Sequence, residues 1–245
     1  MTETVLALDT CTPVLSVAVA GPDARASMEI DAGHGMGEVL APTVQRVLAD
    51  AGVDRDRLSA VAVGCGPAPY TSLRVGIMFA KAVGWALGIP VVGACSLDVI
   101  ARAVPGGEPF GVATDARRRE VYWASYDARG CRLRGPLVGA PATVVEACGR
   151  WYGPGFVRHP VGLDPLSERG PDALRLADWL LAEGWQAIDP EAPVRVGDRV
   201  DRILPAALAP ADGDGSEVAG VPQDFFEPAP LYLRRPDAQE PSWRP

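Results

Sequence analysis

The sequence predicts an α/β protein of two subdomains, each built on a mixed β-sheet. Apolar runs of strand length alternate with helix-length segments over the first hundred residues, and a strand–Asp–strand pattern occurs twice. The composition of the 245 residues, 48% hydrophobic and 22% charged, is that of a packed globular chain rather than a disordered one.

The N-terminal elements are expected in the order β-β-β-α-β-α-β-α. The expected strands cover residues 5–10, 14–20, 24–30, 58–66 and 90–94. The expected helices cover residues 36–51, 71–87 and about 97–103. Short tips between the first three strands are typical of an antiparallel meander. A meander that leads into such helical crossovers is the layout of ribonuclease-H-like domains.

The expected helix 36–51 has its apolar residues on one face at helical spacing. Gly52 follows it and is a suitable C-terminal stop, because glycine adopts the left-handed conformation at little cost. Pro42 lies inside this helix, so a kink or a broken first turn is expected.

An internal repeat is suggested by the alignment of Asp115 on Asp9, which places ATDARRREVYWASY over ALDTCTPVLSVAVA. We therefore divide the chain into an N-terminal ribonuclease-H-like subdomain (1–105) and a smaller, more irregular C-terminal subdomain with a tail (106–245). In the second part a helix is expected at 171–184. The Pro-, Gly- and Asp-rich stretch 189–227 is expected to be largely loop.

Composition limits the classes of function. The net charge of −8 and the pI near 4.8 argue against a chain that grips nucleic acid by itself, since phosphate binding is driven by Lys and Arg. Five scattered cysteines without a CxxC pair are typical of a reducing cytosol. The N-terminus has no secretory signal pattern, and Arg74 and Lys81 interrupt the longest apolar segment. We expect a cytoplasmic, soluble protein with no membrane contact.

The residue inventory offers no obvious catalytic or metal centre. The two histidines, His34 and His159, are far apart in sequence, and there is no HExxH, HxxxH, GxSxG or P-loop motif. We therefore expect no catalytic residue, no metal and no cofactor.

Two Asp-led turns are the remaining candidates for a ligand site, with Asp9 and Thr10 in the first and Asp115 and Arg117 in the second. In actin-like and sugar-kinase-like ATPases such tips cradle phosphates, but they need glycine to bring the backbone close. Neither tip has a glycine here, and Pro13 removes a donor from the first. Two interpretations stay open: a weak nucleotide site, or degenerate turns that bind nothing. The arginines 117–119 likewise suit either a phosphate, of a nucleotide or of tRNA, or a solvated turn.

The segment 66–88, GPAPYTSLRVGIMFAKAVGWALG, predicts a rigid turn followed by a helix that is apolar on nearly every side. Small residues recur every four positions at Gly76, Ala80, Gly84 and Gly88, a stripe that lets another backbone approach closely. Either this is a core helix of one domain or it binds another chain. We expect the interface, so that Gly84→Leu or Ala80→Trp abolishes pairing and leaves the chain folded.

Taken in order, several stretches resemble the TsaB (YeaZ) family. They are LALDTCTPVLSVAV, HGMGEVLAPTVQRVLADAG, GCGPAPYTSLRVGI with GWALGIPVVGACSLD, DARRREVYWASYD and PLYLRRPDA. The family usually reads Gly-Pro-Gly-Ser-Phe-Thr-Gly in the loop from Gly66. This sequence departs from it at Ala68, Pro69, Tyr70 and Ser72, which puts a ligand role for that loop in doubt.

The resemblance implies an actin/hexokinase-like (ASKHA) fold and a non-catalytic subunit in the threonylcarbamoylation of adenosine 37 in ANN-decoding tRNAs. It implies pairing with the catalytic homologue TsaD, joined by the ATPase TsaE, with a homodimer plausible in isolation. The chain would bind tRNA only indirectly, through the complex. No protease activity is expected. The interface residues would be Met36, Leu40, Val44, Leu48, Arg74, Gly76, Ala80 and Gly84. The alternative is an ATP-dependent ATPase or phosphotransferase that uses the Asp9 and Asp115 turns.

Overall fold

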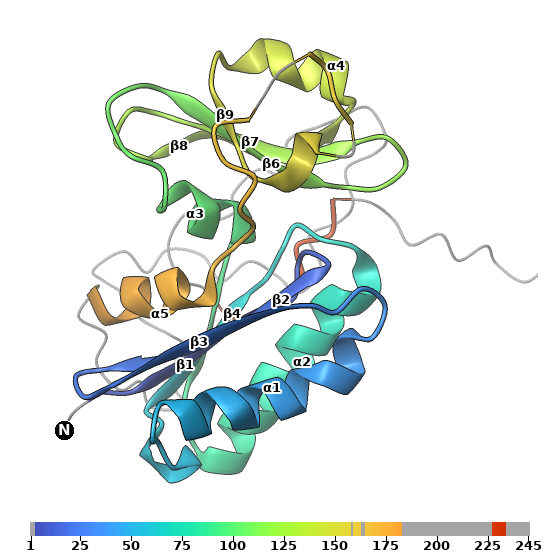
Figure 1. Cartoon of the computed structure of the whole chain (residues 1–245). Helices are drawn as coiled ribbons and strands as arrows, with labels where there is room; N and C mark the ends of the chain where they lie inside the picture. The colour runs from blue at the N-terminus through green and yellow to red at the C-terminus, as the bar shows by residue number, and fades with distance from the viewer. Residues whose placement is uncertain (1–2, 158, 163–164, 183–226, 234–245) are drawn as a thin grey trace, which may run out of the picture.

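The computed structural model describes residues 3–157, 159–162, 165–182 and 227–233 (Figure 1). In these residues one β-sheet lies above another, and helices cover both faces of the larger sheet. The larger sheet has five strands in the order β3-β2-β1-β4-β5, and the smaller has four in the order β8-β7-β6-β9. Both sheets contain parallel and antiparallel pairs, so the predicted α/β class with mixed sheets is confirmed.

The first sheet follows the predicted element order. Its strands are β1 (Val5–Asp9), β2 (Val14–Gly21), β3 (Ala24–Asp31), β4 (Ala60–Gly64) and β5 (Val91–Ala94). The first three form the antiparallel meander, and β4 and β5 add in parallel on the other side of β1. The crossover helices are α1 (Met36–Asp50) and α2 (Tyr70–Leu87), and the short helix α3 (Ser96–Ala101) follows β5.

Residue size differs between the two faces of this sheet. Leu6 and Leu8 of β1 point into the core cluster that includes α1 and α2. Val5 and Ala7 point to the opposite face, which is largely alanine and valine and is covered by α5 (Ala173–Ala182). Small side chains allow α5 to approach closely. Helix α5 confirms the helix expected at 171–184. It packs on the first sheet, although its residues lie in the range 106–245 that the sequence assigns to the second subdomain.

The second sheet repeats the layout of the first. Its strands are β6 (Phe110–Asp115), β7 (Val121–Tyr126), β8 (Arg132–Gly139) and β9 (Trp151–Tyr152). Strand β6 pairs antiparallel with β7 and parallel with β9, as β1 pairs antiparallel with β2 and parallel with β4. Asp9 and Asp115 end the corresponding strands β1 and β6, so the internal repeat read from the sequence is present in the structure.

Two local expectations have different outcomes. Gly52 has φ +64° and follows α1, as the sequence predicts. The alternative of a broken first turn at Pro42 is wrong, because α1 runs without interruption from Met36 to Asp50. Pro42 is exposed, and the buried face of α1 still packs on the sheet. Of the stretch 189–227, expected to be loop, all but Glu227 lies outside the described residues.

A buried polar cluster joins α3 to the second sheet. Asp98 of α3 accepts hydrogen bonds from the Tyr126 hydroxyl at 2.7 Å and from Arg132 Nη1 at 3.1 Å. The side chains of Arg132 and Asp98 are 6% and 2% exposed, so this ion pair is almost entirely removed from water. The two sheets are therefore linked through charged groups that depend on one another.

Candidate functional site

The first Asp turn is closed to a ligand by its own hydrogen bonds. Asp9 is fully buried; Oδ1 accepts from the Cys11 backbone N–H at 2.7 Å and Oδ2 accepts from Ser96 Oγ at 2.6 Å. Burial raises the pKa of Asp9 to about 6, against the Ser96 and Cys11 hydrogen bonds, which lower it. A Cβ on Gly64 of the neighbouring strand would lie 1.8 Å from Asp9 Oδ2, so glycine leaves room for the carboxylate. This geometry favours a structural role for Asp9 over the holding of a metal or a phosphate.

Thr10, the other candidate of the first turn, ties the turn to α2. Its hydroxyl donates to the Ser72 carbonyl oxygen at 2.8 Å, and Thr10 itself is fully buried. A Cβ on Gly76 would lie 2.3 Å from Thr10 Oγ1, so the helix and the turn are in close contact. The structure therefore brings Thr10 to the start of α2 rather than to an open cleft.

The second Asp turn is more open. Asp115 Oδ1 accepts from the Arg117 backbone N–H at 2.8 Å and lies 3.3 Å from His159 Nε2. Tyr122 belongs to the same core cluster as Cys11 and Ala116 of the two turns, and burial, together with the Asp115 charge, raises its pKa to about 12. The structure places Asp115 and Asp9 at equivalent ends of their sheets, and it gives Asp115 local partners of its own.

The tip of this second turn has an unusual backbone. Arg117, Arg118 and Arg119 have φ of +59°, +52° and +63°, the left-handed region that non-glycine residues seldom adopt. Each such residue costs roughly 1 kcal/mol or more. All three arginines are exposed. Hairpin tips that only reverse the chain usually carry Gly, Asn or Asp at such positions.

The predicted interface residues are mostly turned inward, which corrects their assignment to a free surface. Met36, Leu40 and Val44 are buried in the core cluster, and Leu48 packs against it. Gly76, Ala80 and Gly84 are buried as well, and a Cβ on Gly84 would lie 2.2 Å from Val91 Cγ2. The stripe of small residues thus serves close approach to the chain's own residues. Of the predicted set, Arg74 is the exposed member.

The outward face of α2 carries large apolar side chains that the sequence did not single out. Trp85 is 89% exposed and Met78 is 63% exposed. Ala82 and Ala86 are also exposed, and with Met78 and Trp85 they form what we call the α2 outer face. Positions 78, 82 and 85 lie one helical turn apart, so these side chains form a single stripe. Sequence patterning signalled that α2 is apolar all round, but not which side faces the sheet.

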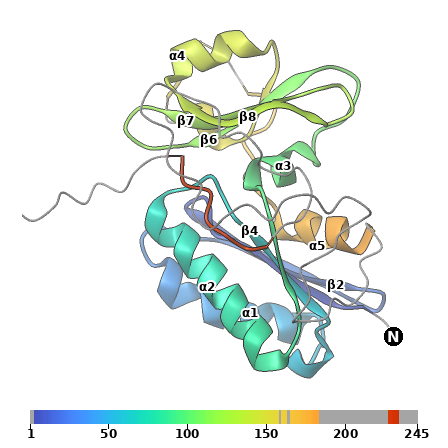
Figure 2. The same ribbon diagram turned by 180° about the vertical axis from the view of Figure 1, so that it is seen from behind.

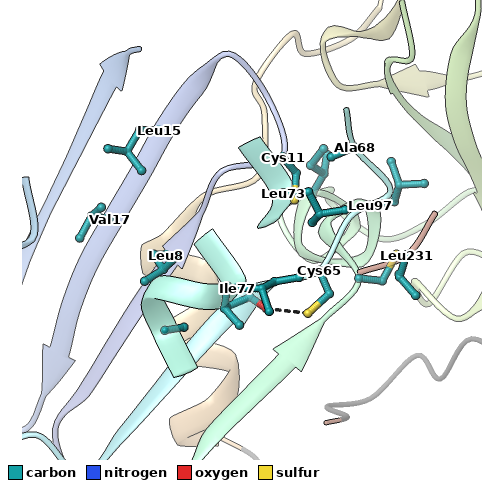
Figure 3. Close-up of a cluster of buried hydrophobic side chains, with 14 of the residues drawn as sticks. Leu8, Cys11, Leu15, Val17, Cys65, Ala68, Leu73, Ile77, Leu97 and Leu231 are labelled. Carbon is teal, nitrogen blue, oxygen red and sulfur yellow. Dashed lines mark hydrogen bonds between the residues drawn. The ribbon is translucent and has the colours of Figure 1, made fainter. Parts of the chain in front are cut away.

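A segment from the end of the chain lies beside the first turns of α2, and we call residues 227–233 the C-terminal strap (Figure 2). Leu231 is 2% exposed and its backbone N–H donates to the Cys65 carbonyl oxygen at 2.9 Å, next to the core residues drawn in Figure 3. Tyr232 of the strap stacks on Tyr70 with ring centroids 4.4 Å apart. Arg74 donates to both tyrosine hydroxyls and lies over the Tyr70 ring. The strap therefore fixes Arg74 beside the α2 outer face.

The described residues contain neither a candidate metal cluster nor a helix that could cross a membrane. No cluster of three or more His, Cys, Asp or Glu side chains is placed to hold a metal ion there. No helix within the same residues has the length and apolarity to span a bilayer.

Comparison with known proteins gives consistent matches. Residues 31–163, more than half of the chain, match the family model TsaD, tRNA N6-adenosine threonylcarbamoyltransferase. An uncharacterised protein of Mycobacterium tuberculosis is 38% identical over 247 residues, covering 97% of this chain and 94% of that protein.

Two further matches are to proteins with a family name. The Escherichia coli tRNA threonylcarbamoyladenosine biosynthesis protein TsaB is 32% identical over 126 residues, 50% of this chain and 54% of that protein. The solved structure of YeaZ from Pseudomonas aeruginosa superposes with a TM-score of 0.61 at 29% identity, covering 74% of this chain and 93% of that one. With its two sheets of repeated layout and these matches, the chain belongs to the TsaB (YeaZ) family of ASKHA-fold proteins.

Proposed function

We propose that this chain is a cytoplasmic, non-catalytic subunit in the synthesis of threonylcarbamoyladenosine in tRNA. Its named relatives are TsaB proteins of that biosynthesis. The buried, doubly hydrogen-bonded Asp9 supports a non-catalytic role, because the ATPase alternative needs that carboxylate to face a ligand. No protease activity is part of this proposal.

The subunit acts by pairing with a TsaD-type catalytic homologue through the α2 outer face. The observation that carries this is the exposure of Trp85, at 89%, beside Met78, at 63%. Exposed large apolar side chains on one helix stripe are typical of protein interfaces, where Trp is enriched among the residues that carry most binding energy. Helix α1 packs beside α2, and its residues Ala41, Gln45 and Ala49 are exposed.

The finer parts of the proposal follow from the family. The modified base is adenosine 37 of ANN-decoding tRNAs, the ATPase TsaE joins the assembly, and the same face forms a homodimer when TsaD is absent. The net charge of −8 makes the complex, rather than this chain alone, the unit that binds tRNA.

Trp85→Glu tests the docking face directly. We expect the affinity for the purified TsaD homologue to fall at least about 30-fold in titration calorimetry, since loss of a Trp hot spot costs about 2 kcal/mol or more. The circular dichroism melting curve should stay unchanged because Trp85 is almost fully exposed. Leu133→Glu is the matched control, as Leu133 is 64% exposed on β8, in the other sheet.

The pathway is tested in the host. Depletion of the chain should lower threonylcarbamoyladenosine in bulk tRNA, measured by nucleoside mass spectrometry, and wild type or Leu133→Glu should restore it where Trp85→Glu does not. An unchanged nucleoside level after depletion would refute the role in the pathway. Full rescue by Trp85→Glu with unchanged affinity would refute the docking face alone.

A further inference from the structure

The tip of the β6–β7 hairpin is a compact cluster of positive charge on an acidic protein. Arg117, Arg118 and Arg119 are consecutive and exposed, on a chain whose net charge is −8. Within the described part of the chain, no carboxylate lies in ion-pair distance of Arg117 or Arg119. The nearby Asp115 carboxylate accepts from the Arg117 backbone N–H rather than from its guanidinium.

The backbone of the tip indicates that the arginine side chains themselves are needed. All three residues have positive φ, a conformation that Gly or Asn would adopt with less strain. A turn with glycine would close the hairpin equally well. Successive residues in a left-handed turn project their side chains in different directions, so the guanidinium groups spread over the tip rather than converge on one point.

We infer that this tip contacts the phosphate backbone of RNA, an inference that rests on the proposed function and names where the chain itself touches the substrate. Guanidinium groups bind phosphate oxygens bidentately, and several spread over an exposed tip suit a chain of phosphates. A small nucleotide is bound in a concave pocket, and the first Asp turn, which would supply the other half of such a pocket, is closed by its own hydrogen bonds.

The position of the tip is compatible with docking. In both views the β6–β7 turn lies at the same end of the molecule as the first turn of α2, where the C-terminal strap also lies (Figures 1 and 2). RNA bound by a partner on the α2 outer face can therefore extend toward the tip. The overall negative charge limits what the tip does alone, so its contribution is to an assembly whose main grip comes from the partner.

The test uses the full chain in equimolar complex with the TsaD homologue, titrated into a labelled anticodon-stem RNA hairpin and followed by fluorescence anisotropy at several salt concentrations. The triple variant R117Q/R118Q/R119Q should bind at least tenfold more weakly. Its log–log salt slope should fall by about two, as expected for the loss of the Arg117 and Arg119 phosphate contacts. The control R55Q/R129Q/R175Q removes three exposed arginines from other faces and should keep both values.

A second variant separates function from folding. R117G/R118G/R119G removes the backbone strain as well as the charges, so its melting temperature should equal or exceed that of wild type while RNA binding is lost. Calorimetry with the partner should give wild-type affinity for both tip variants, which distinguishes a failure of this inference from a failure of docking. If wild type does not pair at all, the proposed docking is wrong; wild type and R117Q/R118Q/R119Q are then titrated alone with the same hairpin at low salt, where equal affinities would overturn the inference.

Three outcomes would overturn the inference. The first is that wild type and both tip variants bind the RNA hairpin with equal affinity. Equal losses in the tip variants and the arginine control would show unspecific electrostatics. Displacement of the hairpin by ATP, with no dependence on RNA length, would assign the tip to a small phosphate ligand.

Discussion

At the scale of single residues, Asp9 shows how a residue type associated with catalysis is used for structure. Each oxygen of its carboxylate accepts a hydrogen bond from the protein, and Gly64 on the next strand leaves space for it. The sequence marked Asp9 as a candidate because an acidic residue ends a buried strand. It contained no signal that Ser96, 87 residues later, would donate to the same carboxylate.

The raised pKa of Asp9 makes stability depend on pH in a defined direction. Between the ordinary value of 3.8 and about 6 the folded chain holds a proton that the unfolded chain releases, so the free energy of unfolding falls as pH rises through this window. The loss amounts to about 3 kcal/mol when complete. In Asp9→Asn the free energy of unfolding should not fall over this pH range. Urea unfolding at intervals from pH 4 to pH 7 measures it. The exposed Asp23→Asn is the control, and Asp9→Asn curves parallel to wild type would show that Asp9 titrates normally.

Gly84 provides a second prediction at this scale. The sequence predicts that a large residue here blocks pairing and leaves the fold intact, but a Cβ would lie 2.2 Å from Val91 Cγ2 and 2.9 Å from the Ile89 carbonyl oxygen. Gly84→Ala should therefore lower the free energy of unfolding by about 1–3 kcal/mol, as overpacking does. Gly37→Ala in α1 should be stabilising by up to about 1 kcal/mol, because the added Cβ would have no atom within 4 Å beyond its chain neighbours and the nearby backbone of its own helix. Chemical denaturation of both variants checks this, and equal stabilities would contradict the packing of Gly84.

At the scale of elements, the sequence predicted much of the N-terminal subdomain, because hydrophobic spacing and glycine stops report local structure directly. Helices α1 and α2 and strands β1 to β5 lie where the spacing placed them, within a few residues. Which side of α2 contacts the sheet could not be predicted in the same way. A helix with apolar residues on every side has no periodic signal to distinguish the sheet from a partner, and the small residues suit either.

The C-terminal strap illustrates another limit at this scale. Its residues were recognised as a family motif, but their contacts join Tyr232 to Tyr70 and Leu231 to Cys65 across more than 150 positions. No local pattern encodes such a pairing. The strap also explains why Arg74, an exposed residue of α2, has a fixed position: it donates to one tyrosine hydroxyl of α2 and to one of the strap.

At the scale of the whole molecule, the Asp98–Arg132 pair joins the sheets. Asp98→Ala leaves the Arg132 guanidinium buried without this carboxylate, so we expect a loss of about 3–5 kcal/mol in the free energy of unfolding. Asp98→Leu combined with Arg132→Met removes both charges and should cost markedly less. Urea unfolding followed by tryptophan fluorescence measures both. A small effect of Asp98→Ala would show that the sheets do not depend on this pair.

The packing of α5 on the first sheet has a consequence for the nascent chain during translation. The alanine-rich face of β1, β2 and β4 is complete once residue 64 has been synthesised, but its cover comes from residues 173–182. During translation the nascent chain therefore carries an open apolar sheet surface while the whole second sheet is being added. Exposed apolar sheet surfaces of this kind favour aggregation, so the chain is most prone to aggregate in the interval before residues 173–182 have been added.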